Sequence, residues 1–148
     1  MTLCFLGYLP EKRIDDVASV LTGMAVRAVP MKPASKLTAK PRSKPRLFAI
    51  DVDSPAAIAF QAELEAELAQ ARLYEPEKRP FWPHITVAKV RSERGTRRPR
   101  RVEREPGELP SALVHTFGSV RVALYRSNLR PEGAQYVSLA SLDLPPAA

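Results

Sequence analysis

The chain is poor in the residues that build disulfide frameworks and metal sites. Its 148 residues include one cysteine and two histidines. The single cysteine, Cys4, cannot form a disulfide within the chain, which favours a reducing compartment. One cysteine and two histidines are also too few for a convincing zinc site, and no clustered aspartates suggest magnesium. We therefore expect neither a bound metal nor a cofactor.

Long apolar runs are missing as well. No stretch approaches the ~18 residues that a membrane-spanning helix needs. The first seven residues lack both the charged leader and the length of a signal peptide. We expect a cytoplasmic protein without a membrane partner. Its length and its apolar content of 45% suit a single domain, residues 1–148, with a sizeable core, and a monomer is expected.

Positive charge is abundant but is concentrated in two segments. The net charge is +7, residues 32–46 hold six basic residues and no acid, and residues 91–104 hold seven arginines against two glutamates. Both segments are rich in proline, serine and glycine and are predicted to be loops. Runs of basic residues are common in solvated loops that bind no partner. The functional alternative is a pair of basic flaps that attract RNA.

Hydrophobic periodicity predicts helices and strands that interleave along the chain. Apolar residues at positions 14, 17, 18 and 21 predict an amphipathic helix that starts at residue 10 and closes at Gly23. Ser54 followed by Pro55 predicts the start of a second helix that reaches about residue 72. Strands are predicted at residues 2–8, 24–29, 46–52, 84–90, 120–125 and 134–144, with a turn at 129–133. This order indicates an α+β or α/β sheet domain.

The most informative stretch, residues 79–89, reads Arg-Pro-Phe-Trp-Pro-His-Ile-Thr-Val-Ala-Lys. A residue before proline favours extended geometry, so a strand is predicted from His84. Period-two alternation places His84, Thr86 and Ala88 on one face of it. An imidazole and a hydroxyl side by side can hold a small anion while the imidazole moves a proton, and Arg79 would add a bidentate clamp for phosphate. A His-x-Thr pair alone is more often structural.

The neighbours of this pair make it more specific. Residues 79–89 resemble the second His-x-Thr motif of the two-histidine phosphoesterase superfamily, in its branch of RNA 2′,3′-cyclic phosphodiesterases, once called 2′-5′ RNA ligases. The signature of that branch is roughly Arg-Pro-Phe-x-Pro-His-hydrophobic-Thr-hydrophobic-Ala-Arg/Lys. Residues 122–136 also resemble the last hairpin of the family. The resemblance implies an α+β, bilobal fold in which two antiparallel-sheet lobes with helices enclose a central cleft, each lobe contributing one His-x-Thr.

The chain departs from this family at the first motif. Members carry His-x-Thr-Leu-x-Phe-Leu-Gly, whereas this sequence opens with Met-Thr-Leu-Cys-Phe-Leu-Gly. Thr2 aligns with the first-motif threonine, and the first-motif histidine would be the residue before Met1. The opening strand and first helix of the family also have no counterpart in the sequence. We therefore expect an incomplete first lobe, either because translation was assigned from an internal methionine or because the chain is truncated.

The resemblance implies a reaction and a role for each site residue. The activity would be hydrolysis of a terminal 2′,3′-cyclic phosphate, on RNA or a small cyclic phosphate ester, to a 2′-phosphate by metal-free acid–base catalysis. His84 would accept the proton of the attacking water, and the absent histidine would be the acid. Thr2 and Thr86 would hydrogen-bond the phosphate oxygens and Arg79 would bind their charge. His115 is not expected to be catalytic, because Thr116 beside it would face the other side of a strand.

Other functions remain open at the level of sequence. If the first-motif histidine is truly absent, the chain would be a catalytically impaired remnant that binds RNA or phosphate without turnover. A relative that acts on another cyclic phosphate, or that ligates 2′-5′ ends, would share the same phosphate-handling residues. A third alternative is a docking role, in which the incomplete first lobe exposes an apolar face.

Overall fold

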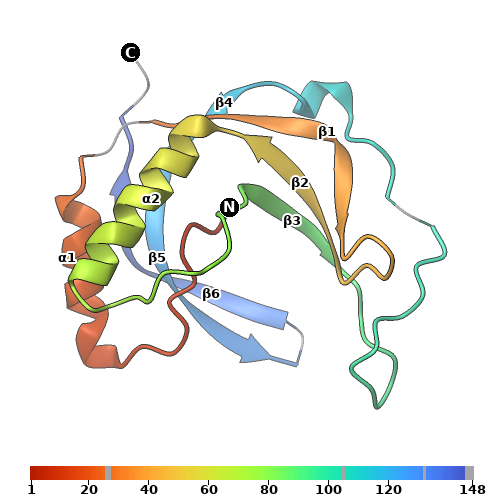
Figure 1. The fold of residues 1–148 in the computed structure, drawn as a ribbon, viewed down its shortest axis with the longest axis horizontal. Helices are drawn as coiled ribbons and strands as arrows, with labels where there is room; N and C mark the ends of the chain where they lie inside the picture. The colour runs from red at the N-terminus through yellow and green to blue at the C-terminus, as the bar shows by residue number, and fades with distance from the viewer. Residues whose placement is uncertain (26–27, 105, 132, 146–148) are drawn as a thin grey trace.

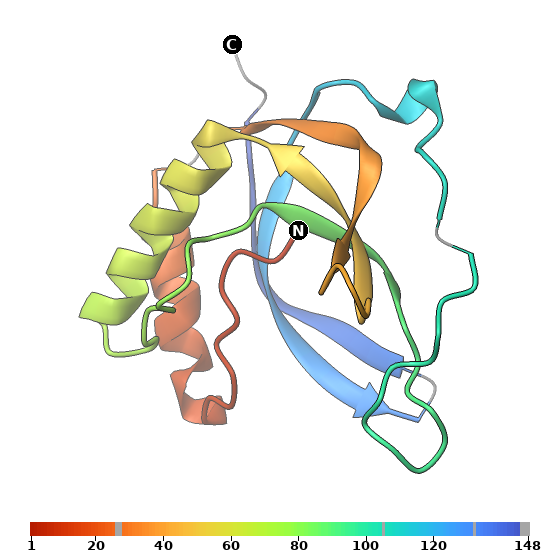
Figure 2. The ribbon, with the colours of Figure 1, turned by 45° about the vertical axis from the view of Figure 1, so that its right-hand side comes forward.

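Two antiparallel sheets and two α-helices form the described part of the chain in the computed structural model, which covers residues 1–25, 28–104, 106–131 and 133–145 (Figure 1). The larger sheet has the strand order β3-β2-β1-β4, and the smaller is the hairpin β5-β6. The helices lie together on one side of the molecule in both views (Figure 2). Within these residues, no helix is both long and apolar enough to cross a membrane.

The larger sheet is built from the middle of the chain. Its strands are β1 (Pro30–Lys40), β2 (Leu47–Asp53), β3 (His84–Lys89) and the short β4 (Phe117–Gly118). Helix α2 (Pro55–Gln70) connects β2 to β3 by way of the loop after Gln70. The Ser54 hydroxyl caps α2 by accepting a hydrogen bond from the Ala57 amide at 3.1 Å, which satisfies one of the free N–H groups of the first turn.

The smaller sheet is formed by the last two strands of the described chain. It pairs β5 (Arg121–Arg130) with β6 (Gly133–Asp143). Helix α1 (Ile14–Gly23), which follows a short 3-10 helix at Glu11–Arg13, packs against this hairpin and against α2. The predicted helices, the strand at β2, the strand that begins at His84 and the final hairpin are therefore confirmed. The predicted α+β fold with two antiparallel sheets is confirmed too.

A hydrophobic core cluster joins the two helices to the smaller sheet and to the N-terminal segment. Its buried members are the helix residues Val17, Leu21, Leu64 and Leu68, together with Leu73. Partly buried side chains from the N-terminal segment and from β5 pack against this cluster, namely Leu3, Cys4, Leu6, Leu9, Val122 and Leu124. The core thus binds the hairpin β5-β6 to the helix that follows β2.

Two predicted strands are wrong. Residues 2–8 form no strand, and among the described residues the hairpin β5-β6 gains no third strand from this segment. Leu3, Cys4 and Leu6 pack on the helical core instead, whereas Phe5 and Tyr8 are exposed. Of the strand predicted at residues 24–29, Met24, Ala25, Ala28 and Val29 are not extended into a sheet, and residues 26 and 27 lie outside the described residues.

The first basic segment, predicted to be a loop, is largely strand β1 and its hairpin to β2. From Lys32 to Lys40 it pairs with β2, and a bulge between Pro33 and Leu37 absorbs the prolines and small residues. Because β4 pairs only with Pro30 and Met31, the rest of β1 is an edge, where lysines are favourable. The arginine segment is irregular as predicted, apart from a bridge between Ser92 and Pro99.

Candidate active site

A bulge in β3 decides which side chains share a face of the larger sheet. His84 pairs with Asp51 and Thr86 pairs with Ala49, but Ala88 pairs with Phe48 and Lys89 with Leu47. Side chains of paired residues point to the same side of a sheet. The extra residue at the bulge therefore places Ala88 on the opposite face from Thr86, contrary to the alternation predicted from sequence, and brings Lys89 to the face of His84.

The face that carries His84 is polar, and we call it the polar face. Across β1, β2 and β3 it presents Thr38, Lys40, Asp51, His84, Thr86 and Lys89. Ala49 lies between Thr38 and Thr86, and its methyl group leaves the two hydroxyl groups unobstructed. His84 and Thr86 are thus brought together as the sequence predicts. Two residues of β1 that lie outside the motif add polar groups to this face: the hydroxyl of Thr38 and the ammonium group of Lys40.

The ring of His84 is held by its own chain. Its Nδ1 lies 2.7 Å from the carbonyl oxygen of Trp82. A carbonyl oxygen can only accept a hydrogen bond, so Nδ1 is the donor and carries a proton. The neutral ring then has its free lone pair at Nε2. The indole ring of Trp82 stacks on the imidazole, with the ring centroids 4.0 Å apart and the planes at 13°.

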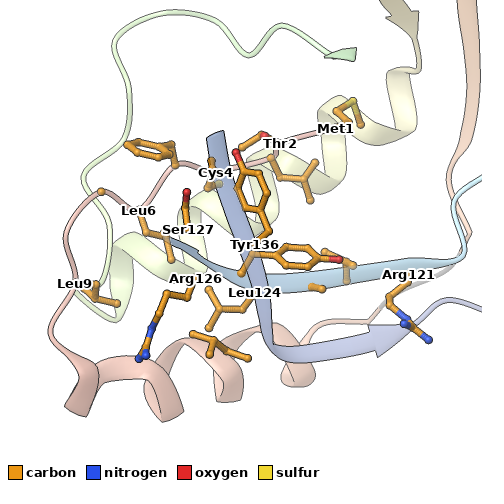
Figure 3. A pocket seen from close by; sticks show the side chains of 18 of the residues that line it. Met1, Thr2, Cys4, Leu6, Leu9, Arg121, Leu124, Arg126, Ser127 and Tyr136 are labelled. Atoms are coloured by element: carbon orange, nitrogen blue, oxygen red, sulfur yellow. The ribbon is translucent and has the colours of Figure 1, made fainter. Parts of the chain in front are cut away.

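A cleft of 1060 Å³ opens between the N-terminal segment and the hairpin β5-β6. Figure 3 shows residues of the N-terminal segment on one side of it and residues of β5 and β6 on the other. Its polar lining includes Thr2, Lys89, Arg121, Arg126 and Ser127. The rings of Tyr125 and Tyr136 also line it and meet edge to face, with centroids 6.4 Å apart. The cleft therefore combines cationic groups with two aromatic rings.

Thr2 and the His84 strand approach each other across this cleft. The N-terminus lies beside the beginning of β3 in both Figure 1 and Figure 2. Thr2 and Lys89 line the same cleft, whereas His84 and Thr86 are not part of its lining. Lys89 shares the polar face with both of them and so connects the His-x-Thr pair to the cleft. The sequence shows that Lys89 follows His84 by five residues. Only the bulge in β3 places the two side chains on the same face of the sheet.

Arg79 and His115 lie elsewhere. The side chain of Arg79 is 88% exposed, and its Nη2 lies 3.7 Å from Glu77 Oε2. This contact directs its guanidinium to Glu77, which is not a residue of the polar face, so this arrangement gives the predicted clamp no support. His115 is exposed in the segment before β4, with its Nδ1 2.8 Å from the carbonyl oxygen of Ala112. Neither residue lines the cleft.

Cys4 is close to the cleft but is a poor nucleophile. Burial raises the pKa of its thiol to about 11, an effect that the nearby carboxylates of Glu65 and Glu77 reinforce and a hydrogen bond from Gln61 opposes. A thiol with so high a pKa is almost entirely protonated near neutral pH. Within the described residues, no group of three or more His, Cys, Asp and Glu side chains could hold a metal ion.

The chain is similar in sequence to one cyclic phosphodiesterase. It is 28% identical to an RNA 2′,3′-cyclic phosphodiesterase of Geobacillus stearothermophilus, over 97% of this chain and 45% of that relative, so it spans less than half of the relative's length. No protein-family model matches the chain.

The backbone is also similar to known crystal structures. TT0787 of Thermus thermophilus matches with a TM-score of 0.76 and 22% identity, over 97% of this chain and 76% of that chain. E. coli LigT, in a complex with 3′-AMP, matches with a TM-score of 0.69 and 21% identity, over 97% and 75% of the two chains. The chain therefore shares the fold of TT0787 and LigT, as expected from the resemblance of its motifs, and its sequence is similar to that of an RNA 2′,3′-cyclic phosphodiesterase.

Proposed function

We propose that the chain opens the terminal 2′,3′-cyclic phosphate of RNA to a 2′-phosphate. The observation that carries the proposal is the polar face, where His84 and Thr86 project side by side and the Nδ1 proton of His84 is already committed to the Trp82 carbonyl. The free lone pair at Nε2 is then the group able to accept a proton. The similarity to an RNA 2′,3′-cyclic phosphodiesterase supports the choice of substrate.

The reaction needs two proton movements and no electron transfer. Nε2 of His84 takes a proton from a water molecule while the water oxygen attacks phosphorus. The bond from phosphorus to O3′ breaks, and O3′ receives a proton, which leaves the phosphate on O2′. The base and the acid are both side chains, so the mechanism calls for no metal ion.

The phosphate would be held by hydroxyl and ammonium groups. The hydroxyl of Thr86 donates to one non-bridging oxygen, and Thr2, from the lining of the cleft, donates to another. The Lys89 ammonium offsets the charge that builds up on these oxygens in the transition state. The Tyr125 and Tyr136 rings give the attached nucleoside an apolar surface.

The acid that protonates O3′ is the second part of the proposal. By resemblance it is a histidine directly before Met1. Consecutive Cα atoms lie ~3.8 Å apart, so such a residue would stay within reach of the cleft that Met1 and Thr2 line.

Replacing His84 tests the base. We expect His84→Ala to reduce hydrolysis of an RNA ending in a 2′,3′-cyclic phosphate by ~10²–10⁴-fold, since a general base typically contributes that much. His115→Ala is the matched control, because it removes the other histidine of the chain from an exposed turn, and it should leave the rate unchanged. Full activity in His84→Ala would rule out His84 as the base.

Adding a histidine tests the acid. The 148-residue polypeptide, made as such, should bind phosphate but turn over slowly, because one of the two proton transfers has no side chain to perform it. A version that carries histidine immediately before Met1 should recover part of a ~10²–10⁴-fold deficit, and a version that carries alanine there should not. Equal rates for the three polypeptides would contradict the two-histidine mechanism.

A further inference from the structure

Trp82 connects the His84 ring to a carboxylate on the neighbouring strand. The indole Nε1 of Trp82 donates a hydrogen bond to Asp51 Oδ1 at 2.6 Å. Asp51 is the residue that pairs with His84 across β2 and β3. The carboxylate therefore lies beside the histidine but bonds the tryptophan that stacks on it.

Both oxygens of Asp51 are occupied. While Oδ1 accepts from Trp82, Oδ2 accepts from the hydroxyl of Thr38 on β1. The carboxylate is thus fixed by residues on either side of it and does not bond the imidazole directly. A carboxylate that accepts two hydrogen bonds is a rigid anchor, because rotation of its side chain would break both.

The backbone next to Trp82 is fixed as well. Pro83 is buried and its carbonyl oxygen accepts a hydrogen bond from the Val52 amide at 3.0 Å. The Lys40 ammonium lies 4.9 Å from the centroid of the Trp82 ring, a distance suited to a cation–π contact. Trp82 is thereby held by its indole N–H, by its ring and by the peptide that follows it.

Two contacts link the fixed Trp82 to the ring of His84. The Trp82 carbonyl oxygen binds Nδ1 at 2.7 Å, and the Trp82 ring covers one face of the imidazole at 4.0 Å. The hydrogen bond selects the tautomer with the proton on Nδ1, and the stacking selects the orientation of the ring. The Trp82 side chain, in direct contact with the base and anchored at its far end, fixes the orientation of the imidazole and so keeps Nδ1 directed at the backbone carbonyl oxygen that selects the tautomer.

We propose that Trp82, anchored by Asp51 and Thr38, is a positioning residue that keeps His84 in a single orientation with the lone pair at Nε2. This inference rests on the proposed function only for its effect on rate. The effect on the tautomer of His84 is a property of the folded chain alone. Trp82 acts through His84 and is not itself assigned a contact with substrate.

The first measurement is the ¹⁵N spectrum of the histidine rings, which contains signals from only two residues. In the parent chain the neutral His84 ring should show one tautomer, protonated at Nδ1. Both variants keep the backbone carbonyl oxygen of residue 82 but lose the stacked ring or its anchor. In Trp82→Ala and in Asp51→Ala the imidazole should therefore turn away from that oxygen and show a mixture of tautomers, while His115 stays unchanged. Asp53→Ala is the matched control, since it removes an exposed carboxylate two residues away on the same strand. An unchanged His84 tautomer in both test variants would overturn the proposal.

The second measurement is the rate of cyclic phosphate hydrolysis. Trp82→Ala should lower kcat by ~10–100-fold with little change in KM, because misplacing a base harms the transition state more than the bound substrate. Asp51→Asn keeps an oxygen that accepts from the indole and should restore most of the activity that Asp51→Ala removes. A loss confined to KM, or no rescue by asparagine, would contradict positioning.

A double variant excludes a general loss of structure. Trp82→Phe and Asp51→Ala break the same hydrogen bond, so their effects on kcat should not add when they are combined. Fully additive losses would overturn the proposed connection between the two residues. If no version of the chain hydrolyses a cyclic phosphate, yet the tautomer changes as expected, the proposed function fails and the positioning of His84 by Trp82 stands.

Discussion

At the scale of single residues, Cys4 shows how local environment suppresses a reactive group. Burial raises the pKa of its thiol from the ordinary 9.0 to about 11. We expect iodoacetamide at pH 8 to alkylate Cys4 in the folded chain about 100-fold more slowly than in the chain unfolded by urea, because the thiolate fraction falls tenfold for each pH unit. Mass spectrometry over time measures both rates. Equal rates would show that the thiol is not protected.

The same shift has a consequence for stability. The folded chain keeps the thiol proton between pH 9 and pH 11, whereas the unfolded chain releases it. The free energy of unfolding should therefore fall as pH rises through this interval. Cys4→Ala removes the titrating group, and its stability should depend less steeply on pH there.

The histidine and threonine of the site could be predicted from period-two alternation, but Lys89 could not. Its face depends on one extra residue in β3, and a bulge is decided by pairing with β2 rather than by the sequence of β3 itself. The contact of Asp51 with Trp82 joins residues 31 positions apart. No local pattern in the sequence contains it.

At the scale of elements, Ser54 ties the start of α2 to the start of β1. Its hydroxyl accepts from the Ala57 amide at 3.1 Å and donates to the Pro30 carbonyl oxygen at 2.6 Å, and the residue is only 2% exposed. The first of these bonds could be predicted from the Ser-Pro pair. The second is tertiary and had no signal in the sequence.

Removing this hydroxyl should be costly. We expect Ser54→Ala to lower the free energy of unfolding by about 1–3 kcal/mol, because the helix loses its cap and a buried carbonyl group loses a donor. Ser19→Ala is the control: that hydroxyl is exposed and bonds only within α1, so its loss should change stability by less than about 0.5 kcal/mol. Urea denaturation measures both, and equal costs would contradict the tertiary role of Ser54.

The wrong strand predictions share a physical cause. A strand is stable only where a neighbour completes its hydrogen bonds, and sequence periodicity does not reveal the neighbour. Residues 2–8 are apolar enough for a strand but find none to pair with among the described residues, while β1 forms despite its prolines because β2 lies beside it.

At the scale of the whole molecule, the arginine segment is one of two concentrations of positive charge. Four of its seven arginines, Arg97, Arg98, Arg100 and Arg101, follow a small turn around Gly95. If this segment attracts RNA, changing the four arginines to glutamine should weaken RNA binding. On single-stranded RNA, the salt slope should become shallower by about 0.7 for each phosphate that the variant no longer neutralises. Hydrolysis of a small cyclic nucleotide should be nearly unaffected.

A second basic segment provides the comparison. Neutralising Lys32, Lys36, Arg42 and Lys44 on the β1–β2 hairpin removes the same number of charges from another surface. Binding titrations at several salt concentrations distinguish the two. An unchanged slope in the arginine variant would make that segment a solvated loop. Equal effects of both variants would show that net charge matters and its place does not.

Because Trp82 contacts His84, the intrinsic fluorescence of the protein reports on the surroundings of the histidine. Trp82 is the only tryptophan of the chain, so all indole fluorescence originates at the proposed site. Its ring touches the imidazole, and its N–H is bound to a carboxylate. Emission intensity and wavelength should therefore respond to whatever changes the ring beside it. Binding at the polar face beside His84 can be followed in unlabelled protein, without any chemical turnover.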